Sequence, residues 1–198
     1  MNYFAKYLTR PTTRTYIFAI LALLTLVVLG EFLMGRVFTS ATGNLYFWYG
    51  PTNSAEASQQ ISDWYTLSHL IHGFAFYLLF WWIGKKHNWP LGLRLFFAVL
   101  AECIWELWEN TPIAINRYRT ATISLGYNGD SIINSLSDIV AMMIGFFAAY
   151  KLPVWASITL VIILELVALY AIRDNLALNI LMFLTPVEAV KNWQASGM

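Results

Sequence analysis

The chain has 198 residues, of which 59% are hydrophobic and only 12% are Asp, Glu, Lys or Arg. About a quarter of the residues of an ordinary soluble domain are charged, so this composition excludes a soluble globular domain with a normal surface. The net charge of +1 gives no indication of a nucleic-acid partner or of an acidic tail. The composition indicates instead an integral membrane protein whose main partner is the lipid bilayer.

Apolar stretches along the chain approach the roughly 20 residues that a helix needs to cross a bilayer. We place these stretches near residues 15–34, 65–84, 91–109, 131–150 and 153–172. Because lipid offers no hydrogen-bond partners, each stretch is predicted to be a helix that satisfies its own backbone groups. The sequence therefore predicts an all-α, polytopic bundle of about five spans that forms a single membrane domain over residues 1–198.

The positions of the basic residues predict how the bundle is oriented. Lys6, Arg10 and Arg14 precede the first span, and Lys85 and Lys86 directly follow the second. The first apolar stretch is longer than the apolar region of a typical signal peptide, so we interpret it as a retained anchor. We therefore expect the N-terminus to lie inside and the C-terminus outside.

Two segments between or after the spans carry signals of local structure. In the long loop after the first span, Asn53 and Glu56 have the spacing of a capping box, which favours a short surface helix. After the last span, residues 175–192 hold an apolar piece that is too short to cross a bilayer and is broken at Pro186. We expect this piece to form a short helix on the outer face.

Ionisable and polar residues follow one face of each central span, three or four positions apart. They are His69 and His72 in the second span, Glu102, Glu106 and Glu109 in the third, and Ser131, Asn134 and Asp138 in the fourth. At a rise of about 1.5 Å per residue, antiparallel spans bring these faces to one level in the outer half of the membrane. Glu165 of the fifth span is expected near the same level. Because ionisable residues inside a membrane are costly, this convergence predicts one polar pocket that opens to the outside.

The pocket offers the nitrogen and oxygen ligands that a zinc-like or manganese-like divalent ion accepts. We assign the metal ligands to His69, His72, Glu106 and Asp138. Glu102 or Asp130 would then serve as the general base for a metal-activated water molecule. In a metal-free alternative, a histidine oriented by Asp138 is the base, and Ser131 or Ser135 is the nucleophile. A buried polar network that only fixes helix packing is the structural alternative to both.

The remaining candidates are assigned to substrate binding. Arg117 and Arg119 lie in the loop above the predicted pocket, where they would bind a phosphate or carboxylate head group. A plain solvated loop is the alternative interpretation of both arginines. Asn134, at the head of the fourth span, is the third substrate-binding candidate.

A pocket just below the outer surface would meet lipid head groups or lipid-linked substrates, so hydrolysis or group transfer on such a substrate is one hypothesis. Proton- or cation-coupled transport or binding is the alternative, although the inner halves of the spans lack polar residues. A homo-oligomer would supply the missing half of a transporter. A third hypothesis is an accessory subunit whose polar faces pack against another membrane protein.

Three stretches resemble those of a known family. They are residues 68–73 (SHLIHG), 102–110 (ECIWELWEN) and 129–138 (GDSIINSLSD). The family is an uncharacterised alphaproteobacterial one, described as a domain of unknown function with names of the uncharacterised-protein-family kind. The resemblance implies a multi-pass protein of the bacterial inner membrane and supplies no activity. The pattern from Glu106 through Arg117 to Asp138 and Gly145 is also similar to VanZ-like membrane proteins, from which we carry over no function.

Overall fold

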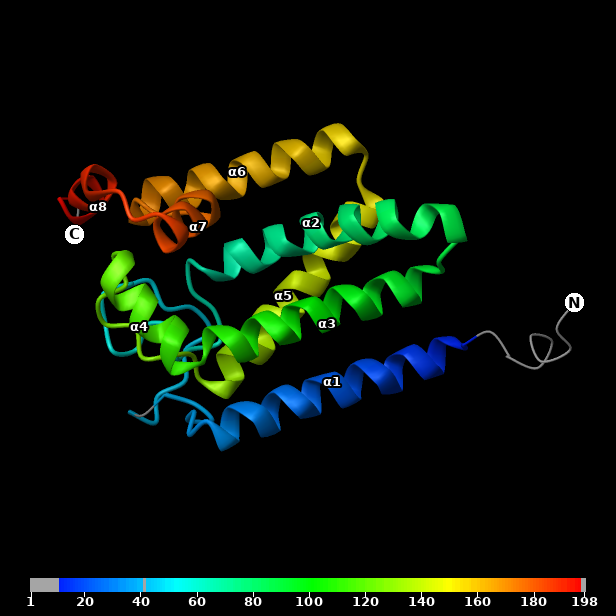
Figure 1. Ribbon diagram of the computed structural model, residues 1–198, viewed down its shortest axis with the longest axis horizontal. Coiled ribbons are helices and arrows are strands. Elements are labelled where there is room, and N and C mark those ends of the chain that lie inside the picture. Colours follow the sequence, from blue (N-terminus) through cyan, green and yellow to red (C-terminus); the bar gives the residue numbers. More distant parts are fainter. Residues whose placement is uncertain (1–10, 41, 197–198) are drawn as a thin grey trace, which may run out of the picture.

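The computed structural model describes residues 11–40 and 42–196, so Lys6 and Arg10 lie outside the described residues. The described chain is all-α, as predicted, and contains no strand. The long helices are α1 (Thr13–Leu33), α2 (Thr66–Gly84), α3 (Leu91–Glu109), α5 (Ile132–Lys151) and α6 (Val154–Ile172). The short helices are α4 (Pro112–Ala121), α7 (Leu176–Leu184) and α8 (Glu188–Ala195), with a 3₁₀ turn at Lys85–His87. The three short α-helices gather at one end of the bundle (Figure 1).

Four helices, α1, α2, α5 and α6, are long and apolar enough to cross a membrane. The remaining predicted span, α3, has 19 residues but carries Arg94, Glu102, Glu106 and Glu109. It packs against α1, α2 and α5 and runs along the bundle beside them (Figure 1). The prediction of about five spans is thus supported for four helices of the described chain, and α3 as a fifth crossing stays a prediction.

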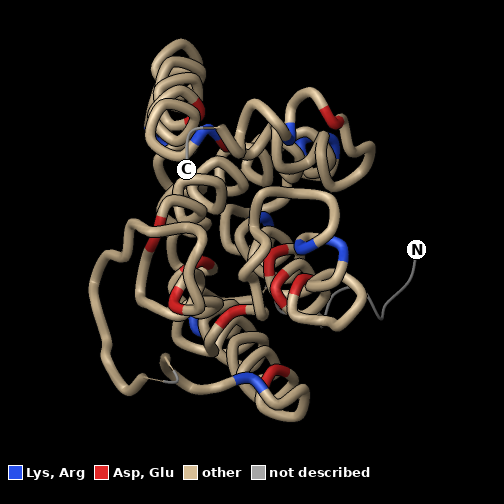
Figure 2. Tube along the Cα trace, turned by 90° about the vertical axis from the view of Figure 1, so that its left-hand side faces the viewer, with Lys and Arg blue, Asp and Glu red and all other residues tan. Residues whose placement is uncertain are grey.

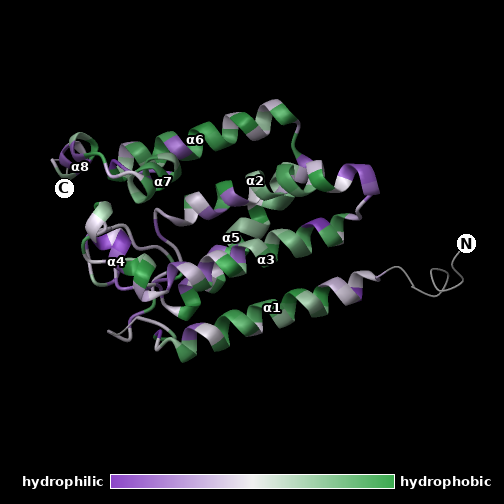
Figure 3. Ribbon diagram, viewed as in Figure 1, coloured by the Kyte–Doolittle hydropathy of each residue, from purple (hydrophilic) through white to green (hydrophobic). Residues whose placement is uncertain are grey.

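The polar and apolar residues of the bundle are separated along its length. Figure 3 shows hydrophobic residues along most of α1 and α6, and hydrophilic residues at the end where α4 lies and in the turn after α2 at the opposite end. Viewed along the bundle in Figure 2, several acidic positions lie between the helices and not on the outside. The other half of the bundle is filled by an apolar core that includes Val99, Ile139, Met142 and Phe146.

The contact between α2 and α5 is the most extensive helix pair of the described chain. Two glycines lie where the helices approach, and a Cβ atom on Gly73 or on Gly145 would overlap the backbone of the opposite helix. Small residues allow membrane helices to come this close. The approach brings His69 of α2 to 3.8 Å from the carboxylate of Asp138 on α5.

The long loop between α1 and α2 covers the start of α5. Backbone carbonyl groups of the loop accept hydrogen bonds of 2.9–3.1 Å from amide groups at this start. The donors are Ser131, Ile132 and Ile133, and the acceptors are Ser58, Val37 and Phe38. Since the first amides of a helix have no partner within the helix, the loop supplies acceptors that α5 would otherwise lack.

The helix predicted from the spacing of Asn53 and Glu56 does not form, and this segment makes consecutive turns. The carboxylate of Glu56 accepts hydrogen bonds from Ser40 and Gln60, so it is not available to cap a helix at Asn53. Ser58 has a φ of 57°, a left-handed conformation that a helix cannot include. The hydrogen bonds that Glu56 accepts from Ser40 and Gln60 therefore replace the helix cap that the sequence predicted at Asn53.

The chain after α6 forms two short helices separated at Pro186, where the sequence predicts one interfacial helix with a break. Glu165 of α6 accepts hydrogen bonds from the amides of Leu176 (3.0 Å) and Ala177 (3.2 Å). A carboxylate at this place stabilises the start of α7 through its free amides and its dipole. Glu165 therefore does not line the polar cavity, because its carboxylate is held at the start of α7.

Candidate functional site

Two histidines on one face of α2 meet a single glutamate of α3. The Nδ1 atom of His69 lies 2.6 Å from Oε1 of Glu102, and Nδ1 of His72 lies 3.1 Å from Oε2 of the same carboxylate. Glu102 is fully buried, and His69 is buried as well. The carboxylate of Glu102 thus bridges the two imidazole rings.

Further carboxylates approach the same imidazole of His69. Its Nδ1 lies 3.4 Å from Oε1 of Glu106, and its Nε2 lies 3.8 Å from Oδ2 of Asp138. Thr66 donates a hydrogen bond of 3.0 Å to the other oxygen of Asp138. Oε1 of Glu106 is buried and has no hydrogen-bond partner among the described residues. A buried carboxylate oxygen without a partner is costly, so this position favours a proton or a cation.

Asp130 lies outside the spans, just before α5, and has its own set of partners. Its carboxylate accepts hydrogen bonds of 2.9 Å from the amide of Asn110 and 2.9 Å from the hydroxyl of Tyr127. Its backbone N–H donates to the side-chain oxygen of Asn110 at 2.7 Å. Burial raises the pKa of Asp130 to about 6, although the hydrogen bonds from Tyr127 and Asn110 act in the opposite direction. Asp130 is thus a carboxyl group that exchanges its proton near neutral pH.

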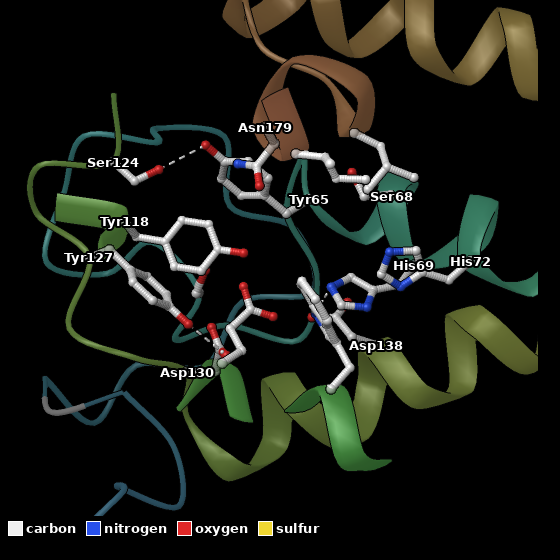
Figure 4. Close-up of a pocket in the computed structure, with 15 residues that line it drawn as sticks. Tyr65, Ser68, His69, His72, Tyr118, Ser124, Tyr127, Asp130, Asp138 and Asn179 are labelled. Carbon is white, nitrogen blue, oxygen red and sulfur yellow. Dashed lines mark hydrogen bonds and ion pairs between the residues drawn. The ribbon is translucent and has the colours of Figure 1, made fainter. Parts of the chain in front are cut away.

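A cavity of about 50 Å³ lies among these groups. Figure 4 shows Tyr118, Tyr127 and Asp130 on one side of it and His69, His72 and Asp138 on the other. Its walls come from five helices and their flanking residues, and they include Tyr65, Ser68, Trp105, Glu109, Ser124, Leu176, Asn179 and Ile180. A space of this size accommodates an ion with a few water molecules or the polar part of a larger substrate.

The structure distributes three of the four predicted metal ligands, His69, His72 and Glu106, over two overlapping sets and leaves Asp138 out of both. Two sets have ligand atoms within 4.8 Å of one another, namely His69, His72 and Glu102, and His69, Glu106 and Glu109. Glu102, predicted as a general base, thus lies where a ligand would lie. Asp138 lines the cavity on the other side of His69.

Ser131 and Asn134 have structural partners. The hydroxyl of Ser131 accepts a hydrogen bond from the backbone of Asn134 (3.3 Å) and donates one to the carbonyl of Gln59 (3.1 Å). The side-chain amide of Asn134 donates to the carbonyl of Gln60 at 2.9 Å. Neither residue lines the cavity, and both attach the start of α5 to the long loop.

The two arginines predicted to bind substrate contact backbone and amide oxygens. Arg117 donates hydrogen bonds to the carbonyls of Phe183 (2.7 Å) and Leu184 (3.2 Å), which attaches α4 to the end of α7. Arg119 donates to the side-chain oxygen of Asn128 at 2.5 Å. Neither arginine lines the cavity.

Sequence reasoning missed α4 and the tyrosines that it helps to position. The sequence signal was present, because Thr111 is the N-cap of α4 and Pro112 lies in its first turn, a pair typical of helix starts. Tyr118 of α4 and Tyr127 both line the cavity. Burial raises the pKa of both phenols, so their hydroxyl groups stay protonated and act as hydrogen-bond donors at neutral pH.

Comparison with known proteins identifies relatives without a known activity. Residues 31–196 match the family described as protein of unknown function (DUF2585). A UPF0314 protein of Sinorhizobium fredii is 50% identical over 184 residues, which are 93% of this chain and 92% of that protein. The UPF0314 protein of Paracoccus denitrificans is 47% identical over 94% of this chain and 93% of its own length. The UPF0314 protein of Sphingopyxis alaskensis is 45% identical over 90% of this chain and 93% of its own length.

No solved structure matches the chain significantly. The fainter similarity to VanZ-like proteins stays a prediction. The matched region, residues 31–196, contains every residue that lines the cavity. The resemblance carried by the three sequence stretches is thereby confirmed, and the chain belongs to the DUF2585 family of proteins of unknown function.

Proposed function

We propose that this protein binds a divalent metal ion beside His69 and uses it to hydrolyse or transfer groups on a lipid or lipid-linked substrate. The observation that supports this most directly is the convergence of Glu102, Glu106 and Asp138 on one imidazole, within 2.6–3.8 Å. All three carboxylates are buried. Carboxylates packed in this way repel one another, and a bound cation removes that repulsion.

The donor set fits a transition-metal ion better than a hard cation such as Mg²⁺. Imidazole nitrogen and carboxylate oxygen together suit zinc-like and manganese-like ions. His69 belongs to both candidate ligand sets, so the ion would lie between Glu102 and Glu106. When bound, such an ion polarises a carbonyl or phosphoryl group and lowers the pKa of a coordinated water molecule.

The residues around the ligand sets supply the other functions that hydrolysis or transfer requires. Asp130, with its pKa near 6, would accept and return a proton during the reaction. The hydroxyl group of Tyr118 would donate a hydrogen bond to a negatively charged oxygen of the substrate, while the hydroxyl of Tyr127 keeps its bond to Asp130. Ser131, held in the cap of α5, would contribute only by positioning this helix.

The proposed location is the bacterial plasma membrane, with the cavity on the periplasmic side. α2 begins beside the cavity and ends at Lys85 and Lys86 on the opposite side of the bundle. If these lysines lie inside, according to the bias of basic residues, the cavity lies outside. The apolar core around Met142 and Phe146 fills the bundle beyond the cavity, which favours an enzyme over a transporter.

The metal content of the purified protein tests this proposal. We expect the wild type, purified without chelators, to contain zinc or manganese in a stoichiometric amount by elemental analysis. His72→Ala and Glu102→Gln should lose most of it, because each removes a ligand atom. His87→Ala is the matched control, since His87 is exposed in the turn after α2, at the opposite end of that helix from the cavity. A wild type that holds no metal even after incubation with both ions would contradict the proposal, as would variants that retain it.

A further inference from the structure

The walls of the polar cavity are acidic and aromatic. Its carboxyl groups belong to Glu109, Asp130 and Asp138, and its aromatic rings include those of Trp105, Tyr118 and Tyr127. No Lys or Arg lines the cavity in the part of the chain that the structure describes. Carboxylates and the faces of aromatic rings both attract positive charge. The cavity therefore favours a cationic ligand group over an anionic one.

A divalent ion beside His69 would leave this preference in place. Such an ion would lie between Glu102 and Glu106, neither of which lines the cavity. Asp130 and Asp138 line the cavity and belong to neither of the two candidate ligand sets. Their negative charges thus remain for a second positive group.

Asp130 and Asp138 each keep one carboxylate oxygen free for a ligand. Asp130 accepts its hydrogen bonds on Oδ2, and Asp138 accepts its hydrogen bond on Oδ1. Among the described residues, none donates a hydrogen bond to Oδ1 of Asp130 or to Oδ2 of Asp138, which lies 3.8 Å from Nε2 of His69. Unlike Oε1 of Glu106, neither oxygen is fully covered by protein, so a ligand in the cavity can reach both. Figure 4 shows the two aspartates on opposite sides of the cavity.

The size of the cavity favours a primary ammonium group over a bulkier cation. The cavity volume is about 50 Å³. A water molecule occupies about 30 Å³ in the liquid, and a primary ammonium group is of similar size. This group also carries several N–H donors and no acceptor, which matches carboxylate oxygens on two sides. A trimethylammonium group is larger and has no N–H, so it would leave both oxygens without a hydrogen bond.

We propose that the cavity binds the primary ammonium group of a lipid head group between Asp130 and Asp138, which makes an ethanolamine-type phospholipid the substrate. The inference deepens the proposed function, on which it rests for the lipid nature of the substrate. In such a lipid a short ethylene linker joins the ammonium group to the phosphate, so the phosphoryl group lies within reach of an ion beside His69. A bound ammonium group stabilises the ionised form of Asp130, which is the form that accepts a proton in the proposed reaction.

Binding of short-chain lipids to the purified full chain tests this inference. Isothermal titration calorimetry in a non-ionic detergent would compare the dihexanoyl forms of phosphatidylethanolamine, phosphatidylcholine and phosphatidylglycerol, which differ only in the head group. We expect phosphatidylethanolamine to bind more tightly than phosphatidylcholine and about ten-fold more tightly than phosphatidylglycerol, as the gain of charge-assisted hydrogen bonds implies. This comparison needs no variant, so it does not depend on whether a substituted chain folds.

Variants test which carboxyl groups make the contact. Asp130→Asn and Asp138→Asn should each reduce the preference for phosphatidylethanolamine over phosphatidylglycerol several-fold, because each removes a negative charge from the cavity wall. Glu188→Gln is the matched control, since Glu188 is an exposed carboxylate of α8 that does not line the cavity. Thermal unfolding in the same detergent shows whether each variant is folded.

The outcomes separate this inference from the metal proposal. Phosphatidylglycerol or phosphatidylcholine that binds the wild type as tightly as phosphatidylethanolamine would overturn it. Free ethanolamine that binds as tightly as the lipid would identify a soluble amine as the ligand and would also overturn it. His72→Ala should lose metal and keep the preference for phosphatidylethanolamine. That preference in a protein that never binds metal would contradict the metal proposal alone, and bound metal without the preference would contradict this inference alone.

Discussion

Asp174, directly after α6, illustrates how this protein accommodates a carboxyl group away from water. It is 1% exposed and accepts hydrogen bonds from the side chains of Gln194 (3.1 Å), Asn179 (3.4 Å) and Tyr65 (3.5 Å). Burial raises the pKa of Asp174 to about 6, although these hydrogen bonds lower it. The ionised form present at neutral pH therefore costs folding free energy.

The raised pKa predicts the direction of the pH dependence. The folded state holds the proton of Asp174 more tightly than the unfolded state does. The stabilisation that this proton provides is therefore fully present below the unfolded pKa of 3.8 and is lost as the pH rises through about 6. This pKa shift corresponds to at most about 3 kcal/mol of the free energy of unfolding. Asp174→Asn, which keeps an acceptor oxygen, should flatten this part of the pH profile in thermal unfolding measured in detergent. An unchanged profile in the variant would contradict the assignment.

The spacing of polar residues along a helix predicts which helix faces meet, but it does not predict which side-chain atoms lie nearest to one another. The three- and four-residue spacing correctly placed the histidines of α2 opposite the carboxylates of α3 and α5. It could not rank Glu102 against Glu106, because a slide of one turn, about 5.4 Å, exchanges them. The contributions of Tyr118 and Tyr127 depend on how α4 packs, and no periodicity within a span reports on that packing.

The crossing of α2 and α5 positions the site at the level of whole elements. An added methyl group on Gly145 would meet the backbone of Leu70, which has no flexible end that could move aside. We expect Gly145→Ala to reduce stability by about 1–3 kcal/mol, as overpacking does. Because the crossing sets the distance between His69 and Asp138, the variant should also bind metal more weakly than the wild type.

Gly126→Ala provides the matched control for this prediction. The nearest atoms to an added methyl group at Gly126 lie 3.6 Å away, which is ordinary van der Waals contact. Thermal unfolding and elemental analysis of both variants measure the two effects together. Equal stability of Gly145→Ala and Gly126→Ala would show that the helices separate at little cost, and that the crossing does not position the site.

For the whole molecule, the central question is which end of the bundle faces the cytoplasm. We expect alkaline phosphatase to be active when fused after Arg119, near the cavity, and inactive when fused after Lys86. A fluorescent protein that folds only in the cytoplasm should show the reverse pattern at the same two positions. The opposite result at both positions would place the cavity in the cytoplasm and would contradict the proposed periplasmic substrate.

The global fold could be predicted because apolar length is a strong signal. The predicted spans 65–84 and 153–172 agree with α2 (Thr66–Gly84) and α6 (Val154–Ile172) to within one residue. The extent of the single domain, residues 1–198, stays a prediction. The local structure of the loop between α1 and α2 could not be predicted in this way, because contacts between distant segments decide it. The turns around Glu56 show this, since Ser40, 16 positions earlier, binds its carboxylate.

The loop between α1 and α2 has a consequence for how the protein is made. Its carbonyl groups complete the first turn of α5, and Gln59 and Ser131 bond across 72 positions of the chain. The loop therefore leaves the ribosome long before its partner amides, and these contacts form only after the later helices have inserted. Closure of the polar cavity is thus a late step of biogenesis. A reporter protein inserted near Gln59 would prevent these loop contacts from forming and would therefore block assembly of the bundle.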